Sequence, residues 1–132
     1  MSPESVELAQ AWLKKAFSDL AAARLLIRGN ERHLAIGAYH CQQVAEKALK
    51  AYLTARETIF PQTHVLEHLL EFCLSSNSEF QRFRRHTKEL TPLADEFRYP
   101  GDAAEPTLEE AQGSLQMAEE VYAFCEVQLS RL

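Results

Sequence analysis

The stretch YHCQQVAEKALKAYL, Tyr39 to Leu53, decides the fold class of this chain. It has no glycine or proline and is rich in alanine, leucine, lysine and glutamine, which favour the α-helix. Its apolar and small residues form two stripes that together occupy most of the helix circumference. A helix of this kind must be covered on nearly every side, so we expect it at the centre of a helical bundle.

The two stripes differ in the size of their side chains. The first holds larger residues, and the second is unusually small, which lets another backbone come close. We predict that the first stripe lies inside the bundle and that the second faces another copy of the chain across a two-fold axis. The alternative is that both stripes are internal. The stripes are Leu34, Ala38, Ala45, Leu49 and Tyr52, and Gly37, Cys41, Val44, Ala48, Ala51 and Ala55.

The composition of the whole chain agrees with one helical domain spanning residues 1–132. Hydrophobic residues make up 46% and charged residues 25%, as in ordinary globular proteins. Four glycines and five prolines are too few for the turns of a β-sandwich or barrel. The net charge of −5 argues against a general duplex-DNA binder, although a local basic pocket remains compatible with it.

The three cysteines, Cys41, Cys73 and Cys125, are far apart and form no Cys-x-x-Cys pair. We therefore expect buried thiols in a reducing compartment, and neither a disulfide framework nor a zinc site. Residues 1–11 lack the apolar run of a signal peptide, and no stretch is apolar enough to span a membrane. The sequence predicts a cytoplasmic protein with no metal and no cofactor.

Capping signals divide the chain into five predicted helices. Ser2 caps a first helix from Pro3 to the stop signal at residues 29–30, and a second helix runs from 34 to 57. Thr63 caps a short third helix over 64–74. Ser78 opens a fourth helix over 78–97, which Pro92 interrupts. Thr107 with Glu110 opens a fifth helix that ends near residue 130. The predicted fold is all-α: an up-down four-helix bundle with an additional short helix.

A polar line runs along the second predicted helix. Its members are His40, Gln43, Lys47 and Lys50, spaced by three, four and three residues, with Glu46 beside them. This spacing places all four on one helix face. Taken alone, the line favours a solvated face with an internal Glu46–Lys50 ion pair.

Four segments, in the same order along the chain, resemble the HEPN family. These small helical domains are named for their occurrence in higher eukaryotes and prokaryotes and for nucleotide binding. The segment CQQVAEKALKAYL is similar to the family signature, and the others resemble its first helix, its Pro-x-x-His stretch and the end of its fourth helix. The resemblance covers roughly residues 11–127. The three other segments are AWLKKAFSDLAAARLL, FPQTHVLEHLL and EFRYPG.

The resemblance implies a bundle of four to five helices that commonly dimerises. Many members are encoded beside a minimal nucleotidyltransferase, with which they form a toxin–antitoxin or accessory pair. Many others are metal-independent ribonucleases, in which an arginine is followed after four to six residues by a histidine near the end of the fourth helix. That histidine can move the proton of a ribose 2′-hydroxyl, and the arginine can hold the phosphate.

The sequence departs from this ribonuclease motif at its histidine. Arg98 stands at the arginine position, but the residues from Tyr99 to Glu105 include no histidine. The pair Arg28 and His33 falls in the first interhelical turn, and Arg82 and His86 are separated by only three residues, on the expected exposed side of the fourth helix. We therefore predict that ribonuclease activity is absent.

The candidate binding residues are those that the resemblance places around one groove. Arg98 would contact phosphate and Tyr99 would stack on a base. Lys47 and Lys50 would line the same groove, Gln43 would face the ligand, and Gln42 would be a satisfied interior amide. Two alternatives remain open: Arg98 could instead fix its loop to a carboxylate, and His64 has a structural use at the start of the third helix. Arg84, Arg85 and Lys88 form a basic patch that is best explained as solvated surface.

The sequence thus predicts a homodimeric HEPN-like accessory protein, paired with a nucleotidyltransferase and binding nucleotide or RNA without cleaving it. One alternative is a ribonuclease toxin that uses Arg98 with a displaced histidine, His64 or His86. Another is a purely structural dimerisation module. The sequence names neither the nucleotide nor the partner.

Overall fold

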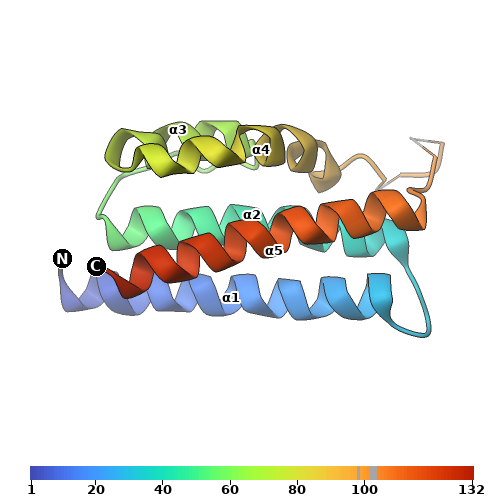
Figure 1. Cartoon of the computed structure of the whole chain (residues 1–132), viewed down its shortest axis with the longest axis horizontal. Helices are drawn as coiled ribbons and strands as arrows, with labels where there is room; N and C mark the ends of the chain where they lie inside the picture. The colour runs from blue at the N-terminus through green and yellow to red at the C-terminus, as the bar shows by residue number, and fades with distance from the viewer. Residues whose placement is uncertain (98, 102–103) are drawn as a thin grey trace.

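A computed structural model describes residues 1–97, 99–101 and 104–132 of the chain. Within this part all regular secondary structure is helical. The helices pack as a layered bundle with α1 on one side, α2 in the middle and α3 and α4 on the other side (Figure 1). The predicted all-α bundle with an additional short helix is confirmed. The elements are α1 (Pro3–Arg28), α2 (Leu34–Ala55), α3 (Leu66–Ser76), η1 (Ser78–Phe83), α4 (Arg84–Leu90), η2 (Thr91–Ala94) and α5 (Leu108–Ser130), where η marks a 3₁₀-helix.

Helices α1 and α2 pack closely because small residues meet between them. Ala16 and Ala23 of α1 and Ala48 of α2 are fully buried. A Cβ atom added to Gly37 would lie 2.5 Å from Ile27 Cγ1, so only glycine permits this approach. The prediction that the small stripe of α2 faces a second copy is therefore wrong. The stripe residues Cys41, Val44, Ala48 and Ala51 have no exposed surface, because they pack within this chain.

The additional short helix, α3, runs in the same direction as α2. After α2 the chain turns back along that helix, which brings His64 beside Glu46 in the middle of α2. Helix α3 then runs toward the C-terminal end of α2, where Ser76 Oγ lies 2.8 Å from Tyr52 Oη. Helix α3 begins two residues later than predicted. Thr63 Oγ1 accepts a hydrogen bond from the Val65 amide, and the Leu66 amide donates to Thr91 Oγ1 of η2.

The fourth predicted helix, expected over 78–97 with an interruption at Pro92, consists of three short pieces that end at Ala94. Asn77, and not Ser78, caps it by accepting a hydrogen bond from the Glu79 amide. Phe80 and Phe83 are both buried, and the three-residue turn of a 3₁₀-helix places such a pair on the same side. Pro92 lacks an amide hydrogen and coincides with the second 3₁₀ piece, as its predicted interruption requires.

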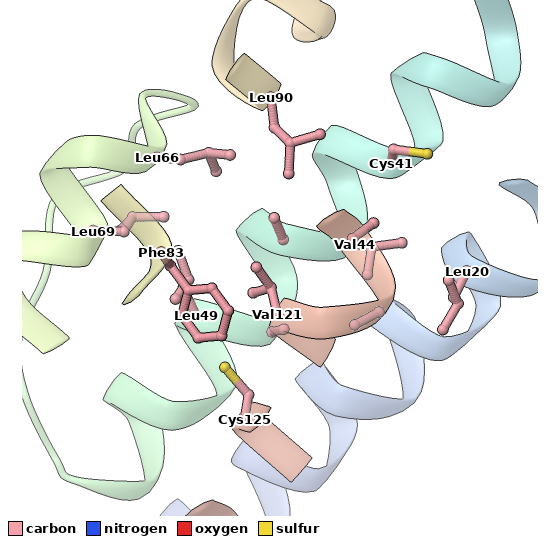
Figure 2. Close-up of a cluster of buried hydrophobic side chains, with 14 of the residues drawn as sticks. Leu20, Cys41, Val44, Leu49, Leu66, Leu69, Phe83, Leu90, Val121 and Cys125 are labelled. Carbon is pink, nitrogen blue, oxygen red and sulfur yellow. The ribbon is translucent and has the colours of Figure 1, made fainter. Parts of the chain in front are cut away.

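Helix α5 closes the core from the front of Figure 1. Its predicted capping box is confirmed: Glu110 N donates to Thr107 Oγ1, and Thr107 N donates to Glu110 Oε1. Figure 2 shows Val121 and Cys125 of α5 directed into a cluster that also includes Leu49 of α2 and Phe83. All three cysteines are buried free thiols, as predicted.

Candidate functional site

The polar line predicted on α2 is the centre of two hydrogen-bonded clusters, each built around one buried carboxylate. We call them the Asp19 cluster and the Glu46 cluster. Asp19 is 8% exposed and Glu46 is 4% exposed, so neither is a solvated surface charge. Buried carboxylates require partners, and both have them.

The Asp19 cluster joins α1 to α2. Asp19 Oδ2 accepts a hydrogen bond from Lys47 Nζ at 2.6 Å, and Asp19 Oδ1 lies 2.8 Å from His40 Nδ1. An ionised carboxylate can only accept, so the proton of the imidazole lies on Nδ1. His40 and Lys47 are seven residues apart, two helical turns, and therefore reach the same carboxylate from one side of α2.

The Glu46 cluster joins α2 to the segment before α3. Glu46 accepts from Lys50 Nζ at 3.0 Å and from Gln42 Nε2 at 3.1 Å, and its Oε1 lies 2.8 Å from His64 Nδ1. Gln42 Nε2 also donates to the His64 carbonyl oxygen, and Gln43 Nε2 donates to Gln42 Oε1. Gln42 is fully buried, so its predicted role as a satisfied interior amide is confirmed.

Opposing effects act on the pKa of Glu46. Burial raises it, but the hydrogen bonds from His64, Gln42 and Lys50, together with the charge of Lys50, outweigh burial and hold the pKa below its ordinary value. Lys50 is itself 8% exposed, and its Nζ lies 5.5 Å from the ring centroid of Trp12. The predicted Glu46–Lys50 pair therefore exists, but as a buried pair and not on a solvated face.

A groove of about 650 Å³ lies between the α4–η2 segment and α5. Its apolar surface comes from Leu93, Phe97 and Met117, which pack against the core. Its charged lining is dominated by five glutamates, with Arg85 and His86 as its basic side chains. Hence the described lining of this groove carries an excess of negative charge. The glutamates are Glu89, Glu96, Glu109, Glu110 and Glu120.

His86 lies at this groove and is only 16% exposed, which corrects the prediction that it stands on an exposed side of its helix. Its Nε2 lies 2.8 Å from Glu120 Oε1, and this hydrogen bond lowers the pKa of Glu120. Its Nδ1 is buried without a hydrogen-bond partner among the described residues. His86 therefore joins α4 to α5.

The predicted binding residues do not all lie in one place. Lys47, Lys50, Gln43 and His64 belong to the two clusters of α2, whereas none of them lines the groove that Phe97 borders. Lys47 is nine residues from Ala38, which does line the groove, so at 100° per residue it points to the opposite side of α2. Tyr99 is 63% exposed, and Arg98 lies outside the described residues.

Sequence reasoning missed the two acidic residues on which these contacts depend. Asp19 was not singled out, although it interrupts the apolar stripe of α1 between Ala16 and Leu20, and a charge at such a position needs a partner. Glu120 was not singled out either, although it lies on α5 between Met117 and Phe124, which pack against the core. In the described ranges, no group of three or more potential metal ligands converges.

The arrangement at α2 can hold and orient two imidazoles, but its lysines are already neutralised by carboxylates. A phosphate at Lys47 or Lys50 would therefore compete with Asp19 or Glu46. The imidazole of His64 is different: its side chain is 74% exposed, and Nδ1 is occupied, so Nε2 is the nitrogen available to a ligand.

With this geometry established, the comparisons with known proteins identify the family. A model of the HEPN domain matches residues 9–128, and the chain belongs to this family. It is similar to a solved structure described as the crystal structure of TT1696 from Thermus thermophilus. The two share 26% sequence identity with a TM-score of 0.73, over 91% of this chain and 97% of that one. No curated protein gave a significant match. In the described part, no helix is long and apolar enough to cross a membrane.

Proposed function

We propose that this HEPN domain binds a nucleotide or RNA without cleaving it and works as the accessory half of a pair with a minimal nucleotidyltransferase. One observation carries the non-cleaving part: Arg98 is followed, from Tyr99 to Glu105, by no histidine. Without an imidazole beside the guanidinium, the site has a group that holds phosphate but none that moves the 2′-hydroxyl proton at neutral pH.

The contacts of His86 and His40 support this proposal. His86, one of two displaced candidates, is mostly buried and held by Glu120, so it has little surface to offer to a substrate. His40 has its Nδ1 occupied by Asp19 and is 27% exposed. Arg98 and the exposed Tyr99 are the proposed contacts to phosphate and base. The secondary candidates are Lys47, Lys50 and Gln43 on α2 and His64 in the segment before α3.

The proposed partners are a second copy and a nucleotidyltransferase, both from family resemblance. The small stripe of α2 is not available for either, because it is buried within the chain. Exposed apolar side chains elsewhere offer alternative contact surfaces. Those on α1, α2 and the loop before α3 are Leu8, Phe17, Leu25, Ile36 and Ile59.

A specific observation favours one second candidate, a metal-independent ribonuclease that uses His64. Glu46 holds His64 through Nδ1 and leaves Nε2 toward solvent, which is the arrangement of an oriented general base. This candidate requires Arg98 and His64 to act on one substrate, across subunits or within one.

RNA cleavage and RNA binding by the purified chain separate these functions. The proposal expects no turnover of an end-labelled RNA, and saturable binding of RNA or ATP that Arg98→Ala weakens about ten-fold, the value of one charge-assisted contact. Arg56→Ala is the matched control, because Arg56 is exposed at the C-terminal end of α2 and forms no ion pair with the described residues.

Three other results would each replace the proposal. Cleavage abolished by both Arg98→Ala and His64→Ala would establish the ribonuclease. Binding that Arg56→Ala weakens as much as Arg98→Ala would show non-specific charge attraction. Neither binding nor cleavage, by a chain that nevertheless dimerises, would leave a structural dimerisation module.

A further inference from the structure

The groove between the α4–η2 segment and α5 is an open feature that the contacts described so far do not explain. It combines an apolar floor, including Leu93 and Met117, with a rim of glutamates. A cleft of about 650 Å³ has the size of a ligand site and not of a packing defect. Its two walls come from segments far apart in the sequence, residues 85–97 and 109–120.

The charges of the rim are only partly neutralised within the chain. Arg85 pairs with Glu89, and Glu110 is engaged in the capping box of α5. Glu120 contacts His86. Among the residues that the structure describes, Glu96 and Glu109 take part in no ion pair. The rim therefore repels phosphate and attracts cations.

A glycine in the wall of the groove leaves room for the close approach of a partner's backbone. Gly113 lies inside α5, where glycine weakens a helix relative to alanine. A Cβ atom added to it would meet no atom within 4 Å, so nothing in this chain requires its small size. A backbone approaching from outside would require it, as Gly37 is required by Ile27 in the interior.

We infer that this groove binds a short lysine- or arginine-bearing segment of a partner protein, with its apolar side chains on Leu93 and Met117 and its backbone against Gly113. This inference names the chemistry of the partner and rests on the protein-pairing half of the proposed function. Charge selects the occupant: nucleic acid is repelled by the rim, and a second copy of a chain with net charge −5 is a poor match for it.

A titration of the full-length ¹⁵N-labelled chain with three probes tests the inference. The probes are an amphipathic Leu/Lys helical peptide, the same peptide with Glu in place of Lys, and a uridine-rich single-stranded RNA. The expected result is saturable binding of the Leu/Lys peptide, with amide shifts centred on Gly113, Ser114 and Met117 and none from the other two probes at this groove. Equal binding of both peptides, RNA shifts at these amides, concentration-dependent self-association through them, or no peptide binding would each overturn it.

Two pairs of variants locate the contact. Glu96→Gln with Glu109→Gln should weaken the Leu/Lys peptide about five-fold, while Glu7→Gln with Glu31→Gln, an equal charge change at exposed residues outside the groove, should leave binding unchanged. Gly113→Ala should weaken it about ten-fold through steric overlap, although the variant remains folded, while the neighbouring Gln112→Ala should not. Equal effects within either pair would overturn the inference.

This test is separable from that of the proposed nucleotide site. Arg98→Ala is expected to reduce RNA binding. Substitution of the groove residues Glu96 and Glu109 is expected to affect only the binding of the peptide. If RNA binding fails while the peptide binds as described, the nucleotide proposal is lost and the groove remains. The reverse outcome removes the groove alone.

Discussion

Replacing Glu46 by glutamine should destabilise the chain more than any other single-atom change on α2. Glutamine has nearly the shape of glutamate, so packing is conserved, and only the charge and one of the two acceptor oxygens are lost. The carboxylate holds Lys50, His64 and Gln42 at 2.8–3.1 Å, at a position that is 4% exposed. The substitution leaves the ammonium of Lys50, itself 8% exposed, facing a neutral amide.

The magnitude follows from this burial. Removing one partner of a buried ion pair costs about 3–5 kcal/mol, because the remaining charge stays desolvated. Lys50 retains its contact with the Trp12 ring, so we take the lower end, about 3 kcal/mol. With an unfolding entropy of about 2 cal/mol/K per residue, this lowers the melting temperature by roughly 10 °C for a chain of 132 residues.

Urea unfolding followed by circular dichroism at neutral pH measures this change in the free energy of unfolding. Glu71→Gln is the matched control: Glu71 also forms an ion pair, with Arg84 at 2.8 Å, but both side chains are more than half exposed, so its loss should cost less than about 1 kcal/mol. The double variant Glu46→Gln with Lys50→Met should recover about 2 kcal/mol, because the stranded charge is gone. A cost for Glu46→Gln no larger than the control, or no recovery in the double variant, would refute the reasoning.

Three further predictions follow from the same structure. Acidification should reduce the difference in the free energy of unfolding between the unmodified chain and Glu46→Gln. The pKa of Glu46 is held below 4.5 in the folded state, so the stability that its carboxylate contributes is complete above that pH and is lost as pH falls through the folded pKa. Unfolding curves whose difference stays constant down to about pH 3 would contradict this. Gly37→Ala should destabilise the chain by about 1–3 kcal/mol because its Cβ would lie 2.5 Å from Ile27. Gly113→Ala should stabilise the chain by about 1 kcal/mol because alanine favours the helix and its Cβ meets no atom. Melting temperatures that move in the same direction for both variants would show that the packing around one glycine is wrong. The three thiols should resist a disulfide reagent until urea unfolds the chain, since burial is the main cause that raises the pKa of Cys41 to about 12, and rapid labelling of the folded chain would show that the thiols are accessible.

Sequence reasoning succeeded where structure depends on contacts within a few residues. The capping box of Thr107 and Glu110 closes over three residues, and both it and α5 were predicted correctly. For the fourth helix it predicted the interruption at Pro92 but missed the 3₁₀-helix η1, in which Phe80 and Phe83 are buried. That outcome depends on how two aromatic rings fit a core formed by other helices, which no local signal contains.

The site shows the same division. The alignment of His40, Gln43, Lys47 and Lys50 on one helix face follows from helix periodicity alone. The orientation of that face does not, and the small stripe was assigned to a second copy although it is buried within this chain. Family resemblance supplied Arg98 and Tyr99 as binding candidates, and these remain proposals.

By itself, the sequence determined that the chain is helical, where most helices begin, and which side chains share a face, because backbone hydrogen bonds in a helix join residues four apart. Only the tertiary structure decided which charge meets which. Lys47 reaches Asp19 across 28 positions and His64 reaches Glu46 across 18. The glutamates of the groove likewise come together from two distant segments. A buried charge must be paired, and its partner is the group that packing brings within hydrogen-bonding distance. Packing is a property of the whole chain, so these pairs are set by the tertiary structure.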